Sequence, residues 1–122
     1  GEHGRRKVLA RAVETCRRAL TLLGSGREGE VRLKIAALLE QQAKFAEAYE
    51  ELKKAQGLLP PERAETIFIK RLSLIERIAA EKKDKNTAVA LLKECGEQAK
   101  RLKLSESALK RLENLKKRLL GG

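Results

Sequence analysis

The chain has 122 residues, a length that suits one compact domain or one segment of a longer array. Lys and Arg number 28 against 17 Asp and Glu, which gives a net charge of +11, and aromatic residues make up only 2%. This composition excludes an aromatic-rich core, and no apolar run reaches the roughly 20 residues that a membrane-spanning helix needs.

The apolar residues recur at spacings of three and four along almost the whole chain, which is typical of amphipathic helices. No stretch alternates apolar and polar residues long enough to predict a strand. We therefore predict an all-α fold with an interior of Leu, Ile, Val and Ala. The six predicted helices span 5–23, 29–42, 44–58, 61–83, 86–102 and 106–119.

Turn-forming residues separate these helices. Gly24, Ser25 and Gly26 end the first helix, and Pro61 suits the first turn of the fourth and longest one. We expect Asn86 to cap the fifth helix, and Gly96 to weaken that helix by roughly 1 kcal/mol without ending it. A capped amphipathic helix is expected after residue 105.

Three of the predicted helices carry two small residues spaced two helical turns apart, so a neighbouring helix can approach closely at each pair. The pairs are Ala12 and Ala19, Ala48 and Ala55, and Ala88 and Cys95. The similarity of these three segments predicts an internal helical repeat.

The segment KFAEAYEELKKAQGLLPPE, residues 44–62, resembles with its preceding helix one unit of the tetratricopeptide repeat. The matching residues are Ala36, Phe45, Glu47, Ala48, Ala55 and Pro60. The resemblance implies a right-handed α-solenoid of antiparallel helix pairs across a single helical-repeat domain, residues 1–122, with the last helix as a C-terminal cap. The spacing between Ala12, Ala48 and Ala88 exceeds the usual period of about 34 residues, so the repeats would be irregular. A weaker resemblance is to the N-terminal helical arms of PCI-class proteasome-lid and signalosome subunits.

Residues with catalytic or metal-binding chemistry are scarce. His3 is the only histidine, and Cys16 and Cys95 have no neighbouring histidine or second cysteine. We expect buried thiols in a reducing compartment, the cytoplasm or nucleus. Glu47, Glu50 and Glu51 lie at helical spacing from Lys53 and Lys54, so surface ion pairs are expected there. The sequence predicts no enzyme, no metal site and no cofactor.

Positive charge gathers near the two ends of the chain. The predicted basic patches comprise Arg5, Arg6, Lys7, Arg11 and Arg18 in the first helix and Lys100, Lys103, Lys110, Arg111 and Lys117 near the end. The spacing of seven between Lys103, Lys110 and Lys117 predicts one shared helix face. A surface of this kind attracts an acidic partner, although each cluster is equally well explained as a solvated helix face.

A groove along the repeat is the predicted partner site, and Lys34, Lys70, Ser73 and Arg77 are expected to line it. Tetratricopeptide proteins that grip a terminal carboxylate use Lys and Asn there, but the corresponding positions hold Glu30, Leu33, Lys34 and Ala37, with no asparagine. We expect a scaffold module that docks another protein or an acidic peptide segment within a larger assembly. The alternatives are a basic helical protein that binds RNA or a ribonucleoprotein, and an engineered helical bundle.

Overall fold

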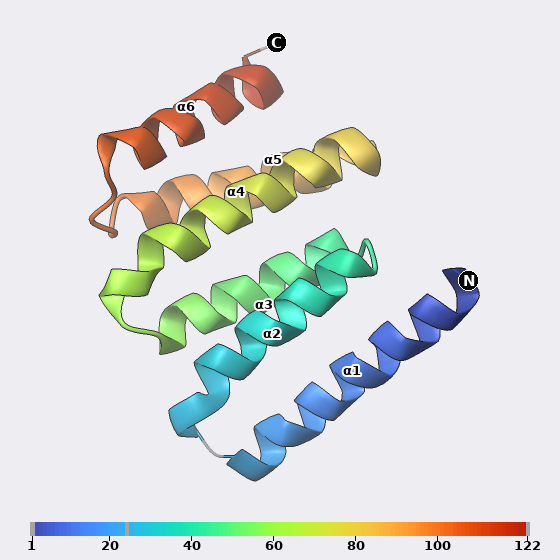
Figure 1. Cartoon of the computed structure of the whole chain (residues 1–122). Coiled ribbons are helices and arrows are strands. Elements are labelled where there is room, and N and C mark those ends of the chain that lie inside the picture. Colours follow the sequence, from blue (N-terminus) through green and yellow to red (C-terminus); the bar gives the residue numbers. More distant parts are fainter. Residues whose placement is uncertain (1, 24, 122) are drawn as a thin grey trace. The chain divides into compact units, whose positions relative to one another are not determined.

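The computed structural model describes the backbone of residues 2–23 and 25–121 and the side chains of 4–22 and 26–121. These residues form no strand, so the predicted all-α class is confirmed (Figure 1). The described helices are α1 (Glu2–Leu23), α2 (Glu28–Gln41), α3 (Phe45–Leu58), α4 (Ala64–Glu81), α5 (Lys85–Ala99) and α6 (Glu106–Leu120).

The chain divides into two compact units, Gly1–Leu59 and Pro60–Gly122, each described below by itself. A single helical-repeat domain over residues 1–122 stays a prediction.

In the first unit, α2 packs against both α1 and α3. The buried side chains of this unit follow the predicted apolar stripes of its three helices, because residues three and four apart share one face of a helix. They include Leu9, Val13, Ile35, Ala36, Leu39, Phe45, Ala48, Tyr49, Leu52 and Ala55. Gly29 of α2 is also buried, and a Cβ there would lie 2.8 Å from Leu59 Cγ, so glycine permits this close approach.

In the second unit, α4 packs against α5, and α6 packs against both. The last helix buries one stripe, Ala108, Leu112 and Leu115, which covers apolar surface that α4 and α5 would otherwise expose. The other buried apolar residues of this unit are Ile67, Phe68, Leu72, Leu74, Ile75, Ile78, Ala88, Leu92, Cys95 and Ala99.

Several predicted helix ends need correction. Residues 61–63 form a short 3-10 turn ahead of α4, which ends at Glu81 rather than at residue 83. Asp84, not Asn86, caps α5, because its side chain accepts a hydrogen bond from the backbone N–H of Thr87 at 3.1 Å. Helix α5 continues through Gly96 as expected but ends at residue 99 rather than 102.

The prediction of buried thiols is confirmed for one of the two cysteines. Cys95 is buried and Cys16 half-buried, and both are free thiols. All three aromatic side chains, Phe45, Tyr49 and Phe68, are at most 2% exposed.

Candidate partner-binding surface

A buried carboxylate joins the three helices of the first unit. Glu51 of α3 is 3% exposed and accepts hydrogen bonds from Arg17 of α1 at 3.1 Å and from Arg32 of α2 at 2.7 Å. Arg32 also donates to Glu28 at 2.9 Å. Burial alone would lower the pKa of Arg32, but the hydrogen bonds to Glu51 and Glu28 outweigh it and raise that pKa. This network is a structural tie between helices.

The expectation of a surface ion pair at Glu51 is therefore wrong. Glu51 lies on the same face of α3 as Ala48 and Ala55, both fully buried, and that face turns toward the neighbouring helices. The sequence carried this signal, because a carboxylate inside an apolar stripe needs a cationic partner from another element.

The second unit has its own buried charge. Arg71 of α4 is fully buried and donates hydrogen bonds to Gln98 and, at 3.5 Å, to Glu94, both on α5. Arg71 is not among the predicted site residues, although it also falls inside an apolar stripe. Arg118 of α6 forms an ion pair with Glu76 of α4 at 3.0 Å, which ties the last helix to the unit.

Four more carboxylates lie close to cations three or four residues away in the chain. The pairs are Glu14 with Arg18 at 3.0 Å, Glu81 with Arg77 at 3.1 Å, Glu97 with Lys100 at 3.5 Å and Glu113 with Lys116 at 3.4 Å. Together with the interhelical ties, these contacts engage many of the acidic side chains inside each unit. Much of the net positive charge is therefore left to cations that face solvent.

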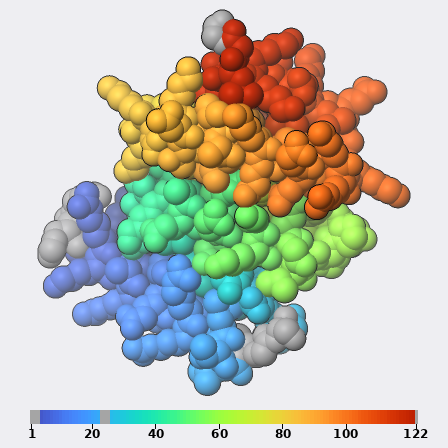
Figure 2. Space-filling view, turned by 180° about the vertical axis from the view of Figure 1, so that it is seen from behind, coloured from blue at the N-terminus to red at the C-terminus, as the bar shows by residue number. Residues whose placement is uncertain are grey.

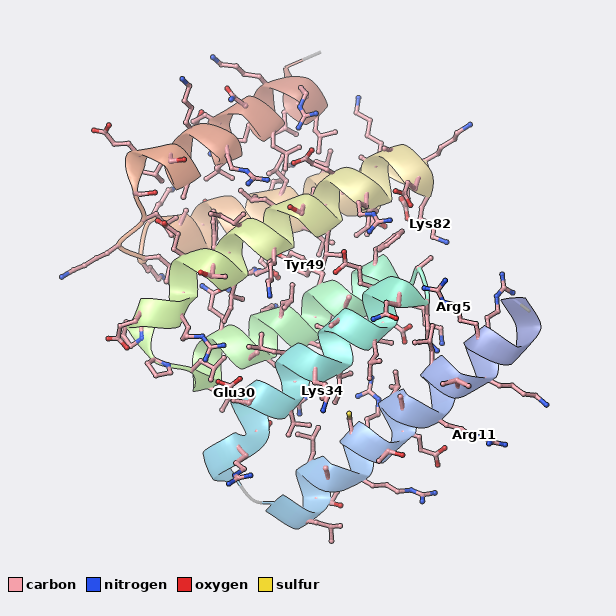
Figure 3. The ribbon with its side chains drawn as sticks, viewed as in Figure 1. Arg5, Arg11, Glu30, Lys34, Tyr49 and Lys82 are labelled. Carbon is pink, nitrogen blue, oxygen red and sulfur yellow. The ribbon has the colours of Figure 1, made fainter. Side chains whose placement is uncertain are left out.

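The first predicted basic patch occupies more than one side of α1. Lys7, Arg11 and Arg18 are exposed on the side opposite the buried Leu9 and Val13, and we call these three residues the α1 cationic face. Lys7 and Arg11 have no carboxylate partner among the described side chains, whereas Arg18 pairs with Glu14. Arg6 is also exposed but lies toward a flank of the helix. Arg5 is exposed too, although it lies one turn before the buried Leu9 on the same side of α1, and Arg5 and Arg11 leave the helix in different directions (Figure 3).

The second predicted patch divides in a similar way. Lys110 and Lys117 are exposed on the outer side of α6 without a carboxylate partner among the described side chains, and we call this pair the α6 cationic face. Lys103 lies before the helix begins, so the spacing of seven does not place it on that face. Arg111 of α6 donates a hydrogen bond to Ser73 of α4 at 3.5 Å, so its side chain points away from the α6 cationic face. Lys100 lies before α6 and pairs with Glu97.

The residues predicted to line a groove are divided between the two units. Lys34 lies exposed on α2 (Figure 3), whereas Lys70, Ser73 and Arg77 share the solvent-facing side of α4. Ser73 and Arg77 are engaged within their unit, by Arg111 and Glu81, while Lys34 and Lys70 have no ion-pair partner among the described side chains. Their role in partner binding stays a prediction.

Other kinds of site find little support in the described part of the chain. There, no three His, Cys, Asp or Glu side chains gather where they could hold a metal ion. The side chain of His3 lies outside the described residues. None of the described helices is both long enough and apolar enough to cross a membrane.

The chain was compared with known proteins. The chain matches none of the protein-family models, curated proteins or solved structures with which it was compared.

Proposed function

We propose that this chain is a docking module that binds an acidic segment of another protein and holds it within a larger assembly, without catalysing a reaction. The proposed setting is a reducing compartment, the cytoplasm or nucleus, which suits the two free thiols.

The observation that carries the proposal is the division of charge on the described surface. Carboxylates such as Glu51 and Glu76 are engaged in ion pairs between helices, while the α1 and α6 cationic faces leave four cations, Lys7, Arg11, Lys110 and Lys117, without a described carboxylate. A surface with excess charge of one sign attracts the opposite charge and accelerates encounter. An acidic partner is the complement of such a surface.

A protein partner is favoured over single-stranded nucleic acid. Proteins that bind single strands use aromatic side chains as stacking platforms for the bases. Phe45, Tyr49 and Phe68 are the only aromatic residues of the chain, and all three are buried. RNA held by its phosphates alone is the alternative outcome of the experiment below.

The proposed architecture is a right-handed α-solenoid of antiparallel helix pairs, similar to tetratricopeptide repeats. The burial of Ala36, Phe45, Ala48 and Ala55 supports this proposal, because the repeat needs small and aromatic residues where its two helices meet. Repeats of this kind present extended surfaces to partners.

Capture of partners by the immobilised chain at low and moderate salt, with and without nuclease, tests the proposal. We expect a specific set of proteins to remain bound after nuclease treatment and to weaken as salt rises, because screening reduces attraction between exposed charges. Collapse of the captured material on nuclease treatment would overturn the proposal in favour of RNA.

A further inference from the structure

A surface hollow of about 260 Å³ lies between α5 and α6 in the second unit. Leu92, Lys93, Gly96 and Glu97 of α5, Lys100 directly after it, and Lys116 and Leu120 of α6 line it. Figure 2 shows the orange surface of α5 beneath the red surface of α6 on the face turned to the viewer. The hollow is below the usual size of a small-molecule site and could hold one or two side chains.

Gly96 leaves room beside the hollow. It is buried in the interior of α5, where glycine costs roughly 1 kcal/mol relative to alanine. A Cβ at this position would lie 3.4 Å from Cε and 3.5 Å from Nζ of Lys116. The end of the Lys116 side chain therefore passes close to the backbone of α5 and brings its ammonium group to the hollow.

The charge around the hollow is mostly positive. Three of its lining residues are lysines and one is a glutamate. Lys93 has no carboxylate partner among the described side chains. Lys100 lies 3.5 Å from Glu97, and Lys116 lies 3.4 Å from Glu113. Ion pairs on the protein surface contribute little to stability. An incoming carboxylate can therefore replace these contacts at small cost.

The apolar lining narrows the choice of occupant. Leu120 is 48% exposed at the hollow, and Leu92 is buried beneath it. A phosphate chain would satisfy the lysines but leave this leucine surface uncovered. A peptide can place an aliphatic side chain on Leu120 and a neighbouring carboxylate against the lysines.

We propose that the α5–α6 hollow receives a protein segment in which a glutamate or aspartate neighbours an aliphatic residue. This inference rests on the proposed docking function and assigns it a defined subsite. The lysines attract the carboxylate, and the contact with Leu120 adds apolar burial that charge alone does not supply.

The probe for this subsite is a fluorescein-labelled peptide of alternating Glu and Leu, with the same peptide in Gln and Leu as its control. We expect the Glu peptide to bind more tightly and to shift the amide resonances of Gly96 and Leu120. The double variant Lys93→Glu, Lys116→Glu should weaken binding by about tenfold, because it replaces attraction by repulsion at the rim. Lys83→Glu with Lys85→Glu makes the same charge change at exposed positions outside the hollow and should weaken it less.

Equal binding of the two peptides, or equal loss in the two double variants, would overturn the subsite, and so would resonance shifts confined to other helices. An RNA oligonucleotide that binds more tightly than the Glu peptide and shifts Gly96 would overturn the choice of a peptide. Nuclease-resistant, salt-sensitive capture of proteins alongside any of these results would leave the proposed docking function standing.

Discussion

At the scale of single residues, Glu51 is the most consequential charged group of the first unit. Glu51 is almost fully buried and pairs with one arginine from each of two other helices. When the Glu51 carboxylate is removed, Arg32, whose side chain is only 17% exposed, keeps Glu28 as its one carboxylate among these contacts. We expect Glu51→Gln to lower the free energy of unfolding by about 2–3 kcal/mol, as for other charged hydrogen bonds. Urea unfolding of the whole chain measures this change in the free energy of unfolding.

Glu50→Gln is the matched control, because the neighbouring carboxylate is exposed. Its removal should change stability by less than about 0.5 kcal/mol. Equal effects of the two substitutions would show that Glu51 is not the tie described above.

Asp84 gives a second test at this scale, since it is the only aspartate and its carboxyl resonance can be assigned directly. Hydrogen bonds from the Thr87 hydroxyl and backbone N–H lower the pKa of Asp84. Ionised Asp84 therefore stabilises the folded chain above its unfolded pKa, about 3.9, and this contribution is lost as pH falls through the lower folded pKa.

Carboxyl ¹³C NMR of Asp84 follows the titration. Thr87→Val should raise the pKa of Asp84 toward the unfolded value, because the shorter of its two hydrogen bonds, 2.7 Å from the hydroxyl, is removed. Thr66→Val, at an exposed position on α4, should leave that pKa unchanged. An unaltered pKa in the Thr87 variant would contradict the described cap.

At the scale of helices, alanine substitutions at two glycines should change the stability of the chain in opposite directions. Gly57 of α3 has open space around it, so Gly57→Ala should stabilise the chain by about 0.5–1 kcal/mol through helix propensity. Gly29 of α2 lies against Leu59, where a Cβ would be only 2.8 Å from Cγ and Cδ2. Gly29→Ala should destabilise the chain by about 1–2 kcal/mol, because overpacking exceeds the gain in propensity.

Thermal or urea unfolding of both glycine variants checks this pair. Stabilisation by Gly29→Ala would show that the start of α2 and Leu59 do not approach as closely as described, and destabilisation by Gly57→Ala would contradict the open space around Gly57.

The sequence predicted the helices well and their ends less well, for a physical reason. Periodic apolar residues determine which segments are helical, whereas an end depends on which of several nearby polar side chains reaches a free N–H. Asp84 and Asn86 both suit a cap, and the hydrogen bond to Thr87 decides between them. Ser105, by contrast, was the expected boundary and does cap α6, accepting from Ala108 at 3.2 Å.

At the scale of the whole molecule, the total charge can be counted from the sequence, but its distribution between internal ion pairs and solvent cannot. Spacing alone could show that Lys110 and Lys117 share a face. It could not show that Arg118 reaches Glu76 on another helix, because that contact depends on tertiary packing. The partners of Glu51 and Arg71 depend on packing in the same way, although the position of each charge inside an apolar stripe indicated its burial. The α5–α6 hollow depends on two helices meeting at Gly96.

The central claim is that particular cations, rather than net charge alone, dock an acidic protein. Its most direct test compares protein capture by the variant with Lys7, Arg11, Lys110 and Lys117 all changed to Glu against a control with the same charge change at other exposed lysines, Lys44, Lys54, Lys83 and Lys85. We expect the first variant to lose the nuclease-resistant proteins and the control to retain them. Equal loss in both, or retention by both, would contradict the claim.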